Sequence, residues 1–134
     1  MKNADPKGIT NTSDMNSPYV NFDYLKELTL GNREGMIIML KAYLEETPTL
    51  LGNLKIGIEK NDWPAVKYAA HSMLPSFPML GMETKYEEIA RKIQDHATRA
   101  EESKEIKKLF SELEVACEKA MHELESELAE LEKK

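Results

Sequence analysis

The sequence predicts an all-α protein built as an antiparallel helical bundle. Leu, Glu, Lys, Ala and Met dominate its 134 residues and β-branched clusters are scarce, a composition that favours helix. Apolar residues recur at spacings of three and four along most of the chain, and short turns separate these periodic segments. Helices joined by short turns pack as antiparallel neighbours, so the segments are expected to share one core.

The beginning of the chain differs from the rest. Residues 1–19 are rich in Asn, Ser, Thr and Pro and show no apolar period, so they are interpreted as a tail or linker. Residues 20–134 are expected to form the helical domain, because a chain of this length has room for one core.

The first helices follow this tail. Asn21 is placed to cap a short helix over residues 22–28, and a longer helix is predicted from Arg33 to Glu46. Thr47 and Pro48 are typical of a new helix start, yet the apolar stripe resumes beyond them, so this region is expected to form either one bent helix or two. The stripe comprises Met36, Met39, Leu40, Tyr43, Leu44, Leu50, Leu51, Leu54 and Ile58.

The next helix is predicted to start at a cap formed by Asp62, with Pro64 as its second residue. Its apolar stripe is Trp63, Val66, Ala70, Met73 and Phe77. Pro75 and Pro78 interrupt this segment, because proline has no amide hydrogen and crowds the carbonyl four residues back. The helix either stops near Leu74 and restarts, or bends and continues to the turn at Gly81. Phe77 keeps the phase of the stripe, which favours the bent, continuous helix.

Two further amphipathic helices complete the predicted bundle. The first carries Tyr86, Ile89, Ala90, Ile93 and Ala97 at helical spacing. The second runs from Ser103, an imperfect capping position, to Leu131. Its stripe is Ile106, Leu109, Phe110, Leu113, Cys117, Ala120, Met121, Leu124, Leu128 and Leu131.

Composition excludes several function classes. The formal net charge of −6 argues against a broad basic face for nucleic acid. No apolar run approaches the roughly 20 residues that a bilayer span requires, and no signal-peptide core is present, so no membrane association is expected. A single cysteine, Cys117, cannot form an internal disulfide and is weakly consistent with a reducing compartment. The expectation is a cytoplasmic monomer.

Few side chains in the sequence are candidates for chemistry. His96 and His122 lie on charged helices and are interpreted as solvated surface histidines. Cys117 falls on an apolar stripe and is expected to be a small core residue. No glycine-rich phosphate loop, paired-cysteine site or di-iron pattern is present, so no metal site or resident cofactor is predicted.

His71 has a different setting. On a helical wheel of about 100° per residue it lies well round from the apolar stripe, so it is expected to project from the helix flank toward solvent. Lys67 precedes it by one turn and could pair with an attached phosphoryl group. An exposed imidazole is partly neutral and nucleophilic at neutral pH. Most histidines on helix flanks nevertheless have no function.

Several short motifs give the chain a family resemblance. They are the run Tyr43-Leu44-Glu45-Glu46 followed by Pro48, the Asp62-Trp63 turn, the Ala70-His71 pair, and Leu80-Gly81 ten residues after the histidine. Together they make residues 22–128 resemble a histidine-containing phosphotransfer domain. The family's Lys and Gly three and four residues after the histidine are replaced by Leu74 and Pro75. This departure resembles modules of some bacterial hybrid sensor kinases, and it bears on transfer rate and partner choice.

The resemblance implies an antiparallel four-helix bundle with one or two short extra helices. It assigns the phosphoacceptor role to His71 and a supporting charge to Lys67. It also implies a phosphocarrier without kinase activity of its own. Its implied partners are response-regulator receiver domains and a hybrid histidine kinase. The receiver would supply the Mg²⁺ and the acceptor aspartate.

A docking rim and an alternative function complete the sequence-based hypotheses. Leu74, Pro75, Met36 and Leu40 are predicted to form an apolar rim for the receiver, although each is equally compatible with ordinary core. The alternative is a non-catalytic interaction module, because Leu124, Leu128 and Leu131 extend the last apolar stripe in a way that suits a coiled coil.

Overall fold

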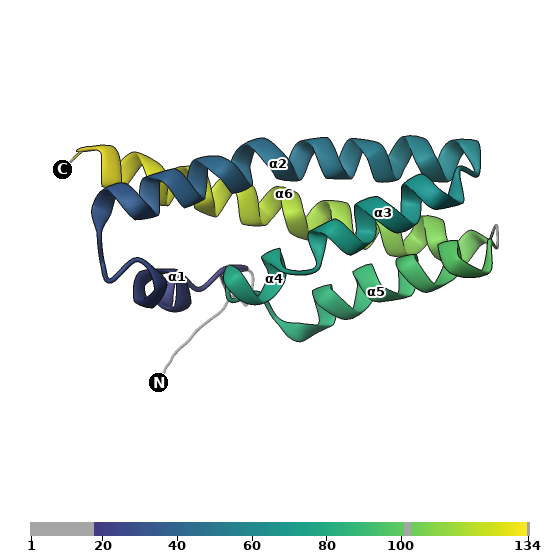
Figure 1. Ribbon diagram of the computed structural model, residues 1–134, viewed down its shortest axis with the longest axis horizontal. Coiled ribbons are helices and arrows are strands. Elements are labelled where there is room, and N and C mark those ends of the chain that lie inside the picture. Colours follow the sequence, from purple (N-terminus) through teal and green to yellow (C-terminus); the bar gives the residue numbers. More distant parts are fainter. Residues whose placement is uncertain (1–17, 101–102, 134) are drawn as a thin grey trace, which may run out of the picture.

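The computed structural model describes residues 18–100 and 103–133, and every regular element in these two ranges is a helix (Figure 1). The elements are α1 (Asp23–Leu28), α2 (Arg33–Lys60), α3 (Trp63–Met73), α4 (Ser76–Met79), α5 (Thr84–Arg99) and α6 (Lys104–Lys133). The predicted all-α class is confirmed. Most of the predicted tail, residues 1–17, lies outside the described residues.

The four longer helices form a ring in which each contacts two neighbours. α2 packs against α3 and α6, and α5 packs against the same two helices. Successive members of the ring run in opposite directions in Figure 1, as short connections between helices require. α2 and α6 are much longer than α3 and α5. α1 and α4 lie beside the part of α2 and α6 that α3 and α5 do not cover (Figure 1).

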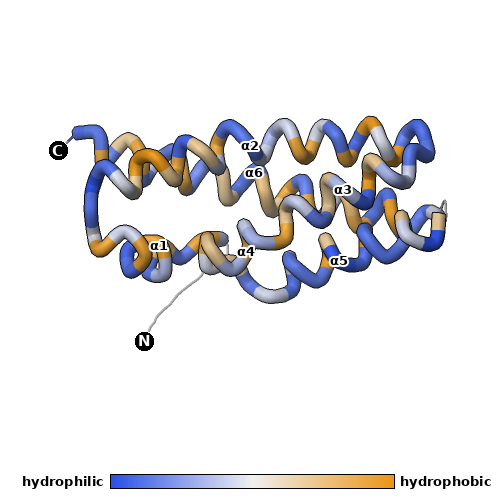
Figure 2. Tube along the Cα trace, viewed as in Figure 1, coloured by the Kyte–Doolittle hydropathy of each residue, from blue (hydrophilic) through white to orange (hydrophobic). Residues whose placement is uncertain are grey.

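The core of the ring consists of the predicted apolar stripes. Apolar and polar residues alternate along each longer helix with a helical period (Figure 2). Leu40, Leu54, Val66, Ile93 and Leu113 are fully buried, each from a stripe that the sequence pattern identified. Burying one such side chain stabilises a fold by about 1.5–3 kcal/mol, so these stripes account for the packing of the ring.

The segment before α1 connects the end of α4 with α6. The amide of Asn21 donates a hydrogen bond of 2.8 Å to the carbonyl of Leu80, next to Gly81. Gly81 has a φ of +65°, and a Cβ there would collide with the Asn21 carbonyl oxygen, so only glycine fits. The amide of Tyr19 also donates to the Glu123 carboxylate on α6, at 2.7 and 2.9 Å. The folded part therefore includes Tyr19, which the sequence analysis assigned to the tail.

α2 passes through Pro48 without a break, which decides between the one-helix and two-helix alternatives. The missing proline amide leaves only the Leu44 carbonyl without its helical partner. Leu40 before the proline and Leu51 after it are both buried on one face of the helix. Continuity keeps both in the core, which offsets a proline cost of about 3 kcal/mol.

The continuous helix predicted through Pro75 and Pro78 is wrong. α3 ends at Met73, and α4 begins only at Ser76. In a continuous helix, Pro75 and Pro78 would leave the carbonyls of His71 and Leu74, four residues before each proline, without helical partners. The break satisfies both, because the His71 carbonyl accepts from the Leu74 amide at 3.2 Å, and the Leu74 carbonyl accepts from the Phe77 amide at 3.4 Å. Phe77 still reaches the core, at 2% exposure.

The end of α6 packs within the chain, against the start of α2. The Arg33 side chain donates from Nε to the Leu131 carbonyl at 2.6 Å, and Lys41 forms an ion pair of 3.3 Å with Glu132. Leu124 is buried, and Leu128 is half-buried against the same core. The apolar stripe that suggested a coiled coil with another protein is thus largely covered by α2.

Candidate functional site

His71 is exposed because the opposite face of α3 packs against the other helices of the ring. The Asp62 side chain accepts the Ala65 amide at 3.3 Å, which confirms the predicted cap. Val66 contacts α2 at Gly57, where an added Cβ would lie 2.8 Å from a Val66 methyl group. The small residues Ala69 and Ala70 are buried beside it. His71 follows on the outer flank and is exposed, as predicted.

One ring nitrogen of His71 faces a polar side chain of the neighbouring helix. The Gln94 side-chain nitrogen on α5 lies 3.5 Å from Nδ1 of His71. Gln94 is half-buried between α3 and α5, two helices that pack closely along their lengths. An amide can donate through its nitrogen or accept through its oxygen, so Gln94 can match either tautomer of the imidazole. Gln94 was not predicted as a site residue from the sequence, because only the pairing of α3 with α5 brings it to His71.

Charge near His71 on α3 is positive. Lys67 is exposed one turn before the histidine, on the same helix flank, as predicted. α3 contains no Asp or Glu, so Lys67 is the sole fully charged side chain in its sequence. An anion that approaches His71 along this helix therefore meets an attractive charge.

His96 is not the solvated surface histidine that the sequence suggested. Its residue on α5 is only 7% exposed, and its side chain faces the first turn of α6. Its Nε2 lies 3.0 Å from a carboxylate oxygen of Glu105, and an Nε2–H donates naturally to that oxygen. The reason is helix phase, since His96 follows the buried Ile93 by three residues and so lies on the inward face of α5.

His122 is exposed, as predicted, but its surroundings are acidic. Its side chain is 84% exposed, and its Nδ1 lies 3.7 Å from a Glu125 carboxylate oxygen. Residues 112–132 of α6 contain eight glutamates and a single lysine. A phosphoryl donor, which is itself anionic, is repelled by such a surface.

Cys117 is a buried core residue, as predicted. Burial and the nearby Glu118 carboxylate raise the pKa of its thiol to about 12. The thiolate is the nucleophilic form of cysteine, so this residue is inert at neutral pH.

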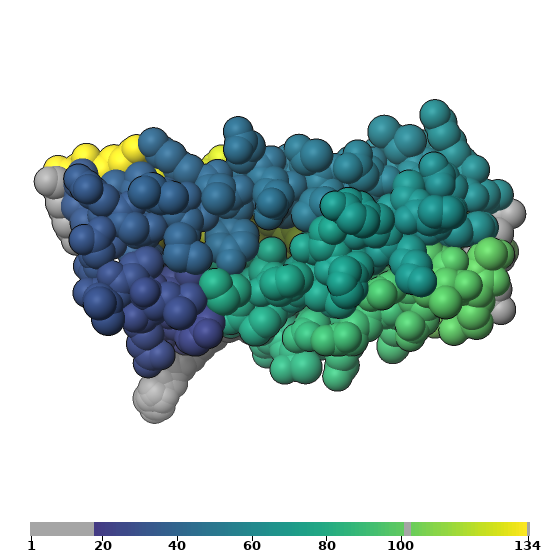
Figure 3. Space-filling model, in the orientation of Figure 1, coloured from purple at the N-terminus to yellow at the C-terminus, as the bar shows by residue number. Residues whose placement is uncertain are grey.

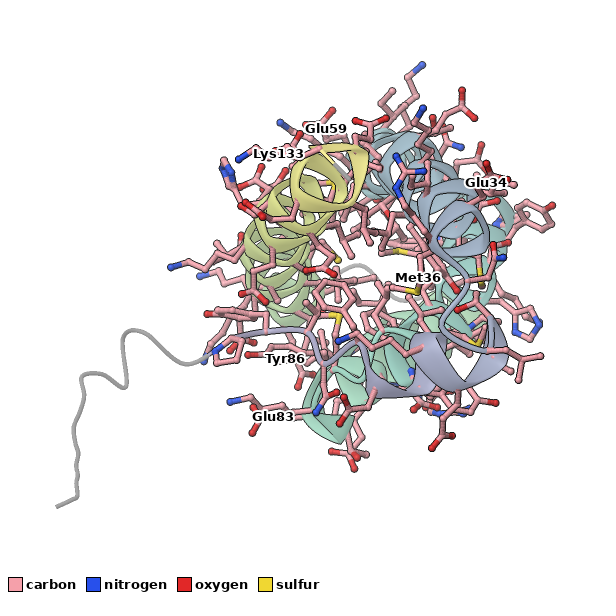
Figure 4. The ribbon with its side chains drawn as sticks, turned by 90° about the vertical axis from the view of Figure 1, so that its left-hand side faces the viewer. Glu34, Met36, Glu59, Glu83, Tyr86 and Lys133 are labelled. Carbon is pink, nitrogen blue, oxygen red and sulfur yellow. The ribbon has the colours of Figure 1, made fainter. Side chains whose placement is uncertain are left out.

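Three of the four residues predicted to form a docking rim are buried. Met36, Leu40 and Leu74 are 2%, 0% and 8% exposed, and only Pro75 is exposed. In the end-on view, Met36 points into the ring while Glu34 points outward (Figure 4). Met36 and Leu40 lie on the apolar stripe of α2, which faces the core, so they are not accessible to a partner.

The described residues hold no cluster of three or more His, Cys, Asp or Glu side chains that could bind a metal ion. Within residues 18–100 and 103–133, no helix combines the length and apolarity that crossing a bilayer demands. No family model matches the chain, and neither a curated protein nor a solved structure matches it.

Proposed function

We propose that the protein is a cytoplasmic histidine phosphotransfer protein that carries a phosphoryl group on His71. One observation supports this most strongly. Of the three histidines, His71 alone is exposed on a helix without acidic residues, with Lys67 on the same flank and Gln94 against its ring. His96 is buried and bonded to a carboxylate, and His122 stands in an acidic stretch.

The transfer step requires one free nitrogen lone pair on the imidazole. When the Gln94 amide presents its oxygen to Nδ1, the proton resides on Nδ1 and the lone pair on Nε2. Nε2 attacks the phosphorus of an aspartyl phosphate on a receiver domain, forming an N–P bond. The P–O bond to the aspartate breaks, and its electron pair leaves with the carboxylate. The ring keeps its Nδ1 proton and carries a positive charge that the phosphoryl group balances.

Phosphoryl transfer depends mainly on position and on neutralising charge. α3 supplies the position, since its opposite face is fixed in the core of the ring. Lys67 supplies positive charge for the phosphoryl oxygens, and Gln94 orients the imidazole. The Mg²⁺ that the reaction requires is bound by carboxylates of the receiver. The protein is thus a carrier that needs no kinase activity of its own, and a monomer suffices for this role.

A transfer assay tests this function directly. Receiver domains from the same genome are phosphorylated with ³²P and mixed with the purified protein in the presence of Mg²⁺. The expected result is label on the protein that is lost in acid and stable in base, the behaviour of phosphohistidine. Absence of label with every receiver of the panel, or an acid-stable label, contradicts the proposal.

A further inference from the structure

A groove lies along α6, away from the flank of α3 that carries His71. It has a volume of about 650 Å³, within the range of clefts that bind ligands. α6 packs against α2 and α5 but not appreciably against α3, so α3 and α6 lie across the ring from one another. In Figure 3, α2 and α3 cover much of the visible face, and the second half of α6 (yellow) is mostly hidden behind α2. A molecule bound in this groove therefore leaves His71 open.

One wall of the groove is apolar and firmly anchored. It is formed by Pro18, Tyr19, Val20 and Phe22. The amides of Tyr19 and Val20 both donate hydrogen bonds to the Glu123 carboxylate, the latter at 2.9 Å. Val20 is also buried in the core, which fixes this short segment against α6. The groove is thus preformed, and a ligand does not have to order this wall when it binds.

The other wall is a row of carboxylates on α6. Glu123, Glu127 and Glu130 follow one another by four and three residues, so they lie along one side of the helix. Among the described residues, Lys119 is the only lysine or arginine that lines the groove. Glu130 also pairs with Lys133 at 3.3 Å, but both side chains are largely exposed, so this pair is weak. The wall therefore carries a net negative charge.

This charge decides which occupant suits the groove. A second copy of the chain has a net charge of −6 and brings its own glutamate-rich α6, so it is repelled. Residues 1–17 contain two lysines and two aspartates, so their side chains offer no net positive charge. The complementary ligand is cationic, and it also carries an apolar part that can lie against the first wall.

We infer that this groove binds a basic segment of a partner protein, in which Lys or Arg side chains accompany an aromatic or aliphatic one. The cations pair with Glu127 and Glu130, and the apolar side chain lies against Tyr19 and Phe22, whose rings also attract cations. The inference goes beyond the proposed function and does not rest on it. Because the groove and His71 lie on different sides of the ring, the protein can hold this partner and a receiver together.

Two serines of α6 provide matched variants. Ser126 is exposed and lines the groove, whereas Ser111 is exposed on the same helix and lines a different groove, between α5 and α6. The two positions are about 22 Å apart along the helix, well beyond the Debye length of about 8 Å at physiological salt. Ser126→Arg therefore places a cation in the groove, and Ser111→Arg adds the same charge to the protein outside it. Arginine is a good helix former, so both variants should keep the wild-type circular dichroism spectrum.

The probe is a fluorescent synthetic peptide of Lys, Arg, Leu and Trp residues, and its affinity for the full chain is measured by fluorescence anisotropy at about 0.15 M salt. We expect Ser126→Arg to weaken binding about tenfold or more and Ser111→Arg to stay within about twofold of the wild type. A second peptide, in which Gly replaces Leu and Trp, should bind several-fold more weakly because it makes no contact with the apolar wall.

Three outcomes overturn the groove as a binding site. They are no binding of the basic peptide, wild-type affinity in Ser126→Arg, and equal weakening in both variants, which would mean general attraction to an acidic protein. His71→Gln should bind the peptide as the wild type does. Failure of phosphoryl transfer therefore leaves this inference intact, and failure of peptide binding leaves the proposed function intact.

Discussion

His71 and His96 place the same chemical group on neighbouring helices in opposite environments. His71 lies on the outer flank of α3 and is open to solvent, whereas His96 is 7% exposed and bonded to Glu105 at 3.0 Å. The difference arises from helix phase relative to the core. A histidine that shares the phase of the apolar stripe is used for packing, and one outside that phase remains available for reaction.

His122 is exposed like His71 but lies in a different charge environment. Its side chain is 84% exposed, yet it belongs to a helix half that carries eight glutamates between residues 112 and 132. His71 instead follows Lys67 on a helix without acidic residues. If His71 is the phosphoacceptor, we expect reactivity toward a phosphoryl donor to require both access and a favourable local charge.

The largest effect is expected from His71→Gln. Glutamine cannot form the N–P bond, so transfer from a phosphorylated receiver should fall by at least about a thousandfold. Because the side chain is exposed, the circular dichroism spectrum should be unchanged. The free energy of unfolding should stay within about 0.5 kcal/mol of the wild-type value. His122→Gln is the control, and loss of labelling in that variant would contradict the assignment to His71.

Cys117 provides a buried nucleophile for comparison with His71. A thiol pKa of about 12, against an ordinary 9.0, lowers its thiolate fraction at pH 8 about a thousandfold. Its reaction with a thiol reagent should be slower by that order in the folded protein than in urea. Above pH 9 the unfolded thiol loses its proton before the folded one, so stability should decline between pH 9 and 12. Rapid modification at pH 8 without unfolding would show that the site is open.

His96 is expected to affect stability without affecting transfer. His96→Ala removes the bond to Glu105 and leaves a small cavity between α5 and α6, which should lower the free energy of unfolding by about 1–3 kcal/mol. Urea denaturation measures this change. The rate of transfer per folded molecule should stay within about twofold of the wild type, and a large loss would mean that His96 takes part in the reaction.

Gln94 should affect transfer by a smaller amount. Gln94→Ala removes the group that faces Nδ1 of His71, so the imidazole loses a contact that helps to fix its orientation. A net contribution of about 1 kcal/mol corresponds to a several-fold slower transfer. Affinity for the receiver should not change, and Gln94→Glu, which keeps an oxygen beside Nδ1, should retain more of the rate than Gln94→Ala. A reduced affinity in Gln94→Ala with an unchanged rate of transfer from bound receiver would assign Gln94 to docking instead.

Lys67 is expected to give the smallest effect. An exposed charge-assisted contact to phosphoryl oxygens contributes up to about 1 kcal/mol, so Lys67→Ala should slow transfer or shorten the phosphohistidine lifetime a few-fold. Lys67→Arg should retain most of the wild-type rate because it keeps the charge. Wild-type rate and lifetime in Lys67→Ala would remove Lys67 from the site.

Local sequence was sufficient for features that depend on a single helix. The apolar stripes, the Asp62 cap and the exposure of His71 all follow from helical period and from capping chemistry. The predicted docking rim was wrong at Met36 and Leu40, because both residues belong to the apolar stripe of α2 and are buried in the core.

Prolines show where local sequence is insufficient. Pro48 remains inside α2, whereas Pro75 ends α3, although both interrupt an apolar stripe that continues beyond them. The outcome depends on the number of carbonyls that lose a partner and on the packing that continuity preserves. Gln94 is a second example, because its contact with His71 exists only after α3 and α5 have paired.

If His71 carries the phosphoryl group, ³¹P-edited nuclear magnetic resonance of the phosphorylated protein identifies the ring nitrogen that bears it. We expect a single phosphohistidine, with phosphorus bonded to Nε2 of His71 and coupled to the protons of that ring, and no signal in His71→Gln. A phosphorus resonance that correlates with His96 or His122, or an acyl phosphate in place of phosphohistidine, would contradict it.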